Sequence, residues 1–194
     1  MQETHASLLI ESSLRALVDV LEGGVHKHSG RLIEAARIVT ASLETGGKLL
    51  ICGNGGSAAD AQHIAAEFVN RFRLERRALP AVALTTDSSV LTSIANDYSF
   101  DEVFAKQVAA LAGPKDVLLA ISTSGASPNI RRALDTSRHV GARSILFTGG
   151  TGGEAARHAE LVLCAPSADT PRIQEVHIFW GHVLCELVER SLFA

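Results

Sequence analysis

Two amphipathic patterns occupy residues 1–46. In each, apolar residues recur at helical spacing, and each pattern is followed by a glycine pair, Gly23-Gly24 or Gly46-Gly47. Glycine pairs in these places are typical of helix ends, so we expect two N-terminal helices. The first helix has an apolar stripe of its own, which packs either on its own domain or on a neighbouring subunit. The stripes consist of Ile10, Leu14, Leu17, Val18 and Leu21, and of Leu32, Ala36, Val39 and Leu43.

From Lys48 onward, short apolar runs alternate with helix-like segments. No run alternates polar with apolar residues, which is typical of strands buried on both faces. Strands that alternate with helices predict one α/β domain with a parallel sheet covered on both faces. The runs are 48–53, 80–86, 116–122, 143–149 and 160–166. Helices are expected at 57–71, 88–112 with a break near Asn96-Asp97, 127–140 and about 171–192.

Composition narrows the classes of protein. The chain has 194 residues, of which 46% are hydrophobic and 20% charged, which excludes a disordered chain. Its net charge of −3 offers no general positive field for nucleic acid or an anionic membrane, so an anionic ligand must be captured by loops and helix ends. There is no signal peptide or long apolar span, and Cys52, Cys164 and Cys185 fit reduced thiols. We therefore expect a soluble, cytoplasmic protein.

The first strand runs into a glycine-rich loop, Gly53-Asn54-Gly55-Gly56-Ser57. In parallel sheets, ligands bind beyond the carboxyl ends of the strands. Glycines there let the backbone approach a ligand closely, and Ser57 suits the N-cap of the following helix. We expect this loop to border a binding site.

The helix after this loop carries His63 and Glu67, which are four residues apart and so share one face, with Asp60 one turn earlier. Such a pair can supply two metal ligands or an acid and a base. The alternative is an ordinary ion pair on an exposed helix face. The position directly after a glycine-rich loop favours the functional interpretation.

A second loop, Ser122-Thr123-Ser124-Gly125-Ala126-Ser127, follows the third run and leads into Pro128. Ser127 as N-cap and Pro128 as first helical residue are a typical helix start. Hydroxyl groups and free N–H groups at the positive end of a helix form an anion cradle, here without a basic residue. The loop therefore indicates a phosphate site, such as that for a sugar phosphate, in preference to an ordinary serine-rich loop.

The last helix is apolar nearly all round, which is typical of burial in the domain or at a subunit interface. Within it, Gln174, Glu175, His177 and His182 are polar and need partners. Gln174 and His182 lie eight residues apart, about 80° in azimuth and about 12 Å in rise. To share one metal, their side chains must stretch toward each other, the helix must begin irregularly, or two chains must contribute.

The segments GNGGSAADAQHIAAEF, LTTDSSVLTSIANDYSFDEVFAKQV, STSGASPN and RIQEVHIFWGH, in this order and spacing, resemble the bacterial phosphoheptose isomerases of the sugar isomerase (SIS) domain superfamily. The resemblance extends over nearly the whole chain. It implies a flavodoxin- or Rossmann-like three-layer α/β/α sandwich with a five-stranded parallel sheet. It further implies a single SIS domain over 1–194, in which 1–46 contribute to oligomer packing and 47–194 form the α/β core, and a homotetramer with active sites at subunit interfaces.

The resemblance also implies an activity, the conversion of D-sedoheptulose 7-phosphate to D-glycero-D-manno-heptose 7-phosphate, the first step toward the heptose of lipopolysaccharide. It implies one zinc ion per subunit, held by residues corresponding to His63, Glu67, Gln174 and His182. Glu67 and His182 correspond to the acid/base pair of the family.

Further residues correspond to substrate contacts of the family. Ser122, Thr123, Ser124 and Ser127 correspond to its phosphate-binding residues. Ala126 departs from the family pattern, in which many members have a polar residue, but touches no metal or acid/base position. The other implied substrate contacts are Asn54, Gly55, Gly56, Ser57, Glu67, Arg71, Asn96, Asp97 and Gln174.

Two alternative functions are open to this sequence. The first is a non-catalytic binding protein on the same fold, similar to a relative that associates with a replication initiator. That relative resembles a chain that has lost acid/base positions, whereas Glu67 and His182 are present here. The second is a nicotinamide-dependent oxidoreductase, because GNGGSA matches the weak pattern G-x-G-x-x-A and Asp87 follows the second strand. It leaves His63, Glu67 and the serine-rich loop unexplained.

Overall fold

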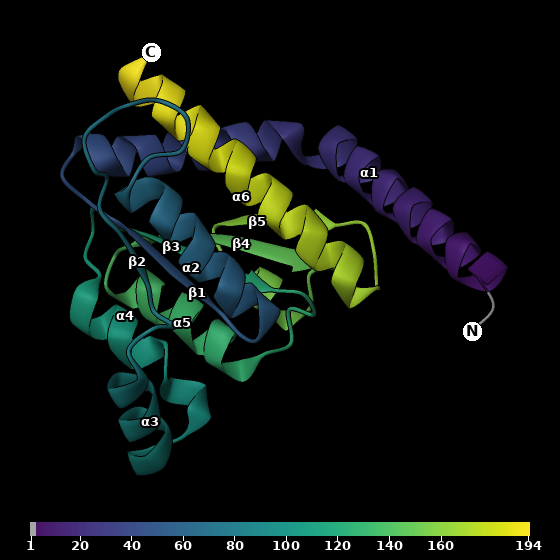
Figure 1. Ribbon diagram of the computed structural model, residues 1–194. Helices are drawn as coiled ribbons and strands as arrows, with labels where there is room; N and C mark the ends of the chain where they lie inside the picture. The colour runs from purple at the N-terminus through teal and green to yellow at the C-terminus, as the bar shows by residue number, and fades with distance from the viewer. Residues whose placement is uncertain (1–2) are drawn as a thin grey trace.

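The computed structural model describes residues 3–194, so the first two residues of the expected 1–194 domain lie outside the described part. Strands and helices alternate along most of the chain (Figure 1). The strands are β1 Leu49–Gly53, β2 Ala81–Ala83, β3 Val117–Ser122, β4 Arg143–Gly149 and β5 Leu161–Ala165. The helices are α1 Glu3–Glu44, α2 Gly56–Val69, α3 Ser88–Asp97, α4 Ala105–Leu111, α5 Pro128–His139 and α6 Thr170–Phe193, with 3-10 turns η1 Phe100–Glu102 and η2 Glu154–Arg157.

All five expected strands form one parallel sheet in the order β2-β1-β3-β4-β5. β1 and β3 are buried along their whole length, as their continuous apolar runs predict. From β1 the chain passes to β2 on one side, and later β3 pairs with the other side of β1. The direction of winding therefore reverses between β1 and β3, and ligands of open α/β sheets bind at such a point.

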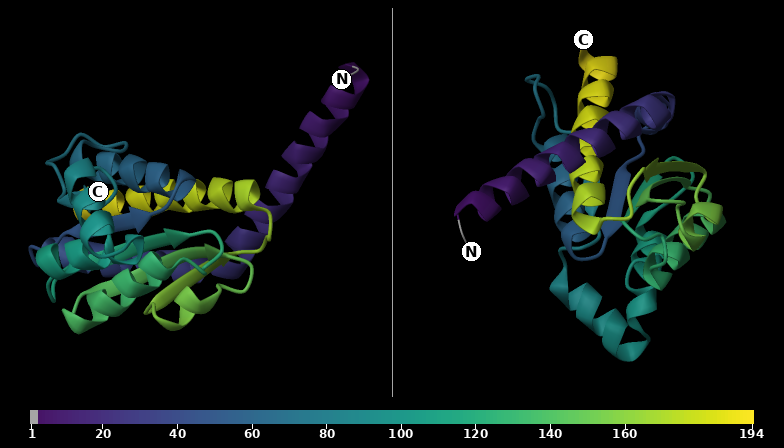
Figure 2. Two further views of the ribbon diagram at one scale, coloured as in Figure 1. Left: turned by 90° about the horizontal axis from the view of Figure 1, so that it is seen from below. Right: turned by 90° about the vertical axis from the view of Figure 1, so that its right-hand side faces the viewer.

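Helices cover both faces of the sheet, so the three-layer α/β/α architecture is confirmed (Figure 2). Alternate residues of a strand point to opposite faces. Leu49 and Ile51 pack into the core under α1, α2 and α6, whereas Leu50 and Cys52 pack into the core under α4 and α5. The break expected near Asn96-Asp97 is also confirmed, since α3 ends at Asp97 and α4 begins at Ala105.

The expectation of two N-terminal helices is wrong, because α1 is continuous from Glu3 to Glu44. Gly23 and Gly24 lie inside it, in the stretch that packs on α6, and the helix bends along its course (Figure 1). A Cβ on Gly23 would lie 3.2 Å from Pro166, and one on Gly24 would lie 3.4 Å from the ring of Trp180. These glycines allow close packing on the segment after β5 and on α6 instead of ending the helix.

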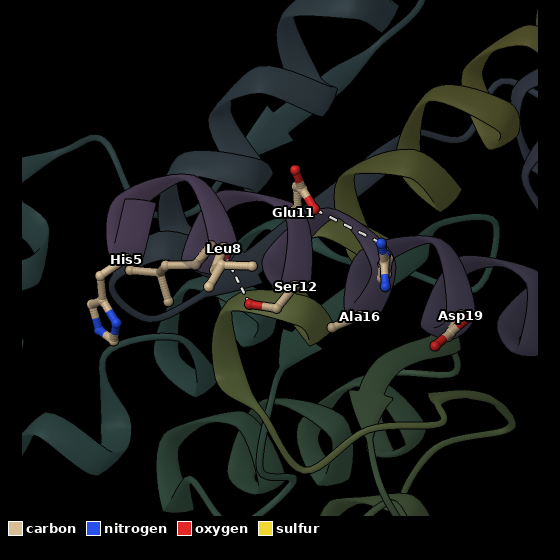
Figure 3. Close-up of a pocket in the computed structure, with 8 residues that line it drawn as sticks. His5, Leu8, Glu11, Ser12, Ala16 and Asp19 are labelled. Carbon is tan, nitrogen blue, oxygen red and sulfur yellow. Dashed lines mark hydrogen bonds and ion pairs between the residues drawn. The ribbon is translucent and has the colours of Figure 1, made fainter. Parts of the chain in front are cut away.

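The amino-terminal part of α1 projects beyond the sandwich (Figure 2). Its side chains Leu8, Leu9, Ile10 and Leu14 are 61%, 55%, 69% and 60% exposed. They do not pack back on their own domain, so packing on a neighbouring subunit stays a prediction. A shallow hollow of about 690 Å³ follows this part of the helix (Figure 3), and no residue expected in the functional site lines it.

Cys52, Cys164 and Cys185 are all free thiols, and burial raises the pKa of each.

No described helix has the length and apolar content needed to cross a bilayer.

His177, a residue of α6, is completely buried against the face of the sheet that α6 covers. Its Nε2 donates a hydrogen bond of 3.0 Å to the carbonyl oxygen of Thr148, while its Nδ1 has no partner within the described residues. Burial lowers the pKa of His177 from its ordinary 6.5 to about 4. The imidazole is therefore neutral in the folded protein at neutral pH.

This burial predicts a pH dependence of stability. In the unfolded chain His177 gains its proton near pH 6.5, whereas in the folded protein it does so only near pH 4. Its contribution is fully present above pH 6.5 and is lost as the pH falls toward about 4. Over this interval the unfolding free energy of the wild type should fall more steeply than that of His177→Gln, by up to about 1.4 kcal/mol per pH unit. Urea unfolding at several pH values measures both slopes, and parallel curves would contradict the prediction.

Candidate active site

The loops after β1 and β3 meet at the carboxyl edge of the sheet, at the reversal between these strands. The side chains of Asn54 and Asn129 exchange two hydrogen bonds of 2.9 Å across the gap. Gly55 has a φ of 57°, which a residue with a side chain adopts at a cost. The glycine-rich loop thus turns sharply and leaves its backbone open to a ligand.

Ser57 is not the N-cap that the sequence predicted. α2 begins at Gly56, with Gly55 as N-cap, and Ser57 is buried within the first turn. The positive φ of Gly55 lets the chain enter the helix earlier than a serine cap would. Ser127, in contrast, is the N-cap of α5 and Pro128 its first residue, as predicted, although the Ser127 side chain makes no capping hydrogen bond.

Three polar side chains converge between α2 and α6. The Nε2 atoms of His63 and His182 are 2.9 Å apart, and His63 Nε2 is 3.5 Å from Glu67 Oε1. The His63 and Glu67 side chains are 49% and 24% exposed, so solvent and ligands reach them. The helical spacing of His63 and Glu67 predicted their shared face, and the structure adds His182 to it.

Close packing of α2 and α6 produces this convergence. A Cβ on Gly181 would lie 2.6 Å from Cδ1 of Ile64, so only glycine fits at this contact. Gly181 immediately precedes His182 in α6, and Ile64 immediately follows His63 in α2, so this contact brings the two histidines face to face. The ring of Phe72 stacks on His182 from the other side, with centroids 5.6 Å apart and planes inclined by 28°.

The converging donors suit a zinc ion in kind and in spacing. Imidazole nitrogen and carboxylate oxygen are common zinc ligands, and tetrahedral bonds of about 2.0–2.1 Å place neighbouring ligand atoms about 3.3 Å apart. The observed separations of 2.9 and 3.5 Å lie on either side of that value. No three His, Cys, Asp or Glu side chains in the described part are already arranged to hold an ion. A rotation at Glu67 or a further donor has to complete the set.

Burial affects the charges around this cluster. It lowers the pKa of His182, and the neighbouring His63 lowers it further, while Glu67 acts in the opposite direction. Burial raises the pKa of Asp60 to about 6, with His63 opposing the shift. His182 is therefore held toward its neutral form, in which it can accept a proton or bind a metal.

The structure places the other expected site residues in different surroundings. Gln174, two turns before His182 in α6, packs directly on Gly56. Its side-chain amide fills the space that a Cβ on Gly56 would need. Arg71 is exposed just beyond α2 and pairs with Glu75 at 3.4 Å. Asn96 and Asp97 are exposed at the end of α3, which packs on the other face of the sheet and is not brought to His63 and His182 within one chain.

The hydroxyl-rich loop lies beside a small pocket of about 270 Å³. Ser122 is buried and its hydroxyl accepts a hydrogen bond from the Gly125 N–H at 3.2 Å, while Ser124 is exposed. Thr123 and Ser124 line the pocket, together with residues of the loops after β4 and β5. This arrangement offers hydroxyl and N–H groups to an anion at the start of α5.

Sequence reasoning missed the segment 150–153, which follows β4 and contributes Gly150, Thr151 and Gly153 to the opposite wall of this pocket. A Cβ on Gly153 would lie 2.5 Å from the carbonyl oxygen of Ser124, so the two loops pack backbone against backbone. The missed signal was a run of three glycines and a threonine directly after an expected strand, the same position that drew attention to the other loops.

The structure gives Asp87 another role than nucleotide binding. Its Oδ1 accepts a hydrogen bond of 2.9 Å from the Val90 N–H, and Asp87 is the N-cap of α3. A capping carboxylate is a sufficient structural explanation for this residue. Asp87 therefore no longer supports a nicotinamide-dependent oxidoreductase, and only the weak pattern G-x-G-x-x-A remains for that alternative.

Comparison with known proteins identifies the family and the fold. The model of the SIS domain family matches residues 14–149. A curated phosphoheptose isomerase of Geobacter sulfurreducens is 54% identical over 95% of this chain and 97% of its own. The solved phosphoheptose isomerases of Neisseria gonorrhoeae and Francisella tularensis superpose with TM-scores of 0.91 and 0.92, at 39% and 36% identity. They cover 95% and 98% of this chain, and the match covers 99% and 100% of theirs.

The contact at Gly181 yields a prediction about the joint between α2 and α6. Gly181→Ala should lower the unfolding free energy by about 1–3 kcal/mol, because the new Cβ overpacks against Ile64. Adding Ile64→Val should recover part of that loss, since it removes the nearest methyl group. Gly30→Ala is the control: it lies within α1 with nothing within 4 Å of a new Cβ, and should be neutral or stabilising. Urea unfolding measures the wild type, Gly181→Ala, Ile64→Val, the double variant and the control, and additive effects of Gly181→Ala and Ile64→Val would contradict the account.

Proposed function

The chain belongs to the phosphoheptose isomerases of the SIS domain family, and from this premise we propose that it converts D-sedoheptulose 7-phosphate to D-glycero-D-manno-heptose 7-phosphate. Membership makes it a sugar-phosphate isomerase. The specific substrate, the residues that perform the reaction and the cofactor belong to the proposal.

The observation that carries the proposal is the cluster of His63, Glu67 and His182 on α2 and α6, two helices that begin at the edge of the sheet that also holds the hydroxyl-rich loop. His63 Nε2 lies 2.9 Å from His182 and 3.5 Å from Glu67. A carboxylate and an imidazole together can remove and return a proton near neutral pH. The loop at Ser122–Ser127 suits a phosphate, so a sugar phosphate can be held at one end while its other end reacts.

The reaction moves one proton from C1 to C2 and a second from the C1 hydroxyl to the C2 oxygen. In our proposal Glu67 takes the C1 proton, which leaves an enediolate, and His182 performs the complementary transfer. The lowered pKa of His182 favours the neutral imidazole that accepts a proton. The phosphate contacts orient C1 and C2 toward these groups, so that binding energy remote from the reaction is used for positioning.

We propose further that His63, Glu67, Gln174 and His182 hold one zinc ion per subunit. Zinc in this place would supply positive charge next to the developing oxyanion of the enediolate. The ligand chemistry and the spacing of His63, Glu67 and His182 support the proposal. Gln174, which packs on Gly56, would have to turn toward them. A Glu67 that is bound to a metal is a weaker base, so its two roles would alternate during turnover.

A homotetramer with active sites at subunit interfaces is also part of the proposal. The exposed apolar residues of α1 support it, because they lack a partner in their own domain. In such an assembly, Arg71, Asn96 and Asp97 would contact substrate together with the loop residues Asn54–Ser57. We place the enzyme in the cytoplasm, early in the supply of heptose to lipopolysaccharide.

The test is incubation of the purified protein with sedoheptulose 7-phosphate, with and without a chelator, and identification of the product. We expect the heptose 7-phosphate, and loss of activity after the metal is removed and its return with zinc. A protein that forms no product under any metal condition would support the alternative of a non-catalytic SIS-domain binding protein.

Substitution of the acid/base pair gives a sharper prediction. Glu67→Gln and His182→Ala should each lower kcat by about 10²–10⁴-fold or more, because each removes a proton-transfer group. Circular dichroism and size-exclusion chromatography should show unchanged fold and assembly. His139→Ala, an exposed histidine at the end of α5, is the control and should retain wild-type rates. Wild-type rates from Glu67→Gln or His182→Ala would refute the assigned roles.

The phosphate loop predicts a different kinetic signature. Ser124→Ala removes an exposed hydroxyl, and should raise KM by about tenfold through the loss of one hydrogen bond to a charged group. kcat should change by less than about threefold, since the loop does not take part in proton transfer. Steady-state kinetics with the sugar phosphate separates the two constants. A fall in kcat at constant KM would show that this hydroxyl acts on the reacting atoms.

A further inference from the structure

A buried ion pair lies directly behind the catalytic cluster. Arg76, in the segment between α2 and β2, donates through Nε to Glu189 Oε1 of α6 at 2.8 Å. The two side chains are 2% and 1% exposed. Burial of two charges is costly and is tolerated where hydrogen bonds satisfy the remaining polar atoms of both groups. The partners of these atoms therefore indicate what the pair holds in place.

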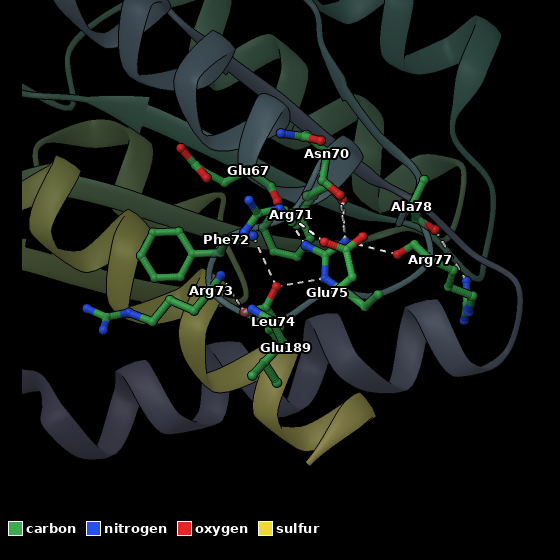
Figure 4. A network of polar contacts seen from close by, with 12 residues as sticks. Glu67, Asn70, Arg71, Phe72, Arg73, Leu74, Glu75, Arg77, Ala78 and Glu189 are labelled. Carbon is green, nitrogen blue, oxygen red and sulfur yellow. Dashed lines mark hydrogen bonds and ion pairs between the residues drawn. The ribbon is translucent and has the colours of Figure 1, made fainter.

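Glu189 receives three consecutive backbone N–H groups in addition to Arg76. The N–H of Phe72 donates to Oε1 at 3.0 Å, and those of Arg73 and Leu74 donate to Oε2 at 2.8 and 2.9 Å (Figure 4). Burial alone would raise the pKa of Glu189, but these amides and Arg76 outweigh it and hold the pKa below its usual value. One carboxylate thus fixes the whole turn that follows α2.

Arg76 uses its remaining donors on the end of α2. Nη2 donates to the carbonyl oxygen of Glu67 at 2.8 Å, and Nη1 donates to those of Phe68 and Asn70 at 2.9 and 3.3 Å. The last carbonyl groups of a helix have no partner within the helix, and a cation there is favourable. The guanidinium thereby fixes the backbone of Glu67, the proposed base.

Phe72 connects the same network to His182. Its N–H is bound by Glu189, and its ring stacks on the imidazole with centroids 5.6 Å apart. Glu189 also lies seven residues after His182 in α6, so both point to the same side of the helix. The carboxylate therefore determines where the aromatic neighbour of His182 lies.

We propose that Glu189 and Arg76 are positioning residues, which orient the proton-transfer pair from behind: Arg76 through the backbone of Glu67, and Glu189 through the turn that presses Phe72 on His182. This inference rests on the proposed function for the roles of Glu67 and His182. It adds three residues, Arg76, Phe72 and Glu189, which act through Glu67 and His182. Since a displacement of about 1 Å can cost about 10²-fold in rate, the effect of losing this support is measurable.

The competing explanation is that the pair only stabilises the fold, and the chain contains a matched control for it. Asp116 is 7% exposed, pairs with Lys48 Nζ at 2.7 Å, and accepts the N–H groups of Lys48 and Gly113 at 2.8 Å each. It lies just before β3, and its partners Lys48 and Gly113 belong to neither α2 nor α6. Asp116→Asn therefore removes a comparable charge with comparable bonds, outside the contacts of the catalytic cluster.

The experiment compares Glu189→Gln, Phe72→Leu and Asp116→Asn with the wild type, at a temperature where all are folded. Glu189→Gln keeps the shape of the side chain but loses its charge and one acceptor. We expect Glu189→Gln and Phe72→Leu to lower kcat on sedoheptulose 7-phosphate by about 10–100-fold, with KM within about threefold. Asp116→Asn should lose stability but keep its kcat. If Glu189→Gln does not fold, Phe72→Leu carries the test, because Phe72 is only partly buried in a turn.

A second readout does not depend on turnover. In the metal-free wild type, the stacked ring of Phe72 should shift the NMR signal of the His182 Hε1 proton upfield. That shift should disappear in Phe72→Leu, shrink in Glu189→Gln, and remain in Asp116→Asn. The backbone amides of residues 72–74 should exchange faster in Glu189→Gln, since they lose a charged acceptor.

The outcomes separate the inference from the proposed function. A wild type without isomerase activity refutes the proposed function, while the NMR comparison still decides whether Glu189 orders the His182 neighbourhood. An active wild type, together with Glu189→Gln and Phe72→Leu that keep kcat within twofold and the His182 signal in place, refutes the positioning role. Equal losses of kcat in Glu189→Gln and Asp116→Asn would show that the pair contributes stability alone.

Discussion

The contact between α2 and α6 at Gly181 is the constraint on which the cluster of His63, Glu67 and His182 depends. A side chain there would meet Ile64, a fully buried residue, so the absence of a Cβ permits the two helices to lie side by side at short distance. This approach brings His63 and His182 together: their Nε2 atoms are 2.9 Å apart, although the two residues are 119 positions apart in the sequence. Rigid helices hold proton-transfer groups more accurately than loops do.

The sheet supplies the second half of the site. Its winding reverses between β1 and β3, and the loops at that point carry glycine, hydroxyl and amide groups but no basic side chain. An anion at this point would therefore be bound by N–H groups, hydroxyl groups and the start of α5. In our proposal the two halves have different tasks: the helices act on the reacting carbons of a phosphorylated sugar, and the loops hold its remote phosphate.

Much of this could be predicted from the sequence, because the relevant signals are local. Continuous apolar runs marked all five strands, the four-residue spacing of His63 and Glu67 placed them on one face, and Pro128 marked the start of α5. Glycine was harder to interpret. Gly23-Gly24 was expected to end a helix, whereas it lets α1 approach α6, and Gly55 displaced Ser57 as the N-cap of α2. A sequence does not distinguish a glycine that ends a helix from one that lets a neighbour come close.

The long-range partners were beyond prediction for a different reason. Glu189 and Arg76 are 113 residues apart, and no local sequence pattern around either residue predicts that they pair. Only the tertiary structure shows that an acidic residue in an apolar helix binds the turn after α2. The same holds for Asn54 and Asn129, and for Gln174, which packs on Gly56 in a way that helical spacing alone left open.

The central claim is that a sugar phosphate binds with its phosphate in the hydroxyl loop and its first two carbons at the side chains of Glu67 and His182. A crystal structure of the protein with bound sedoheptulose 7-phosphate tests it most directly. The account predicts the phosphate in hydrogen-bond contact with Ser124 and its neighbours, and C1 and C2 within reach of Glu67 and His182. A phosphate bound elsewhere, or a sugar whose C1 and C2 lie away from both side chains, would contradict it.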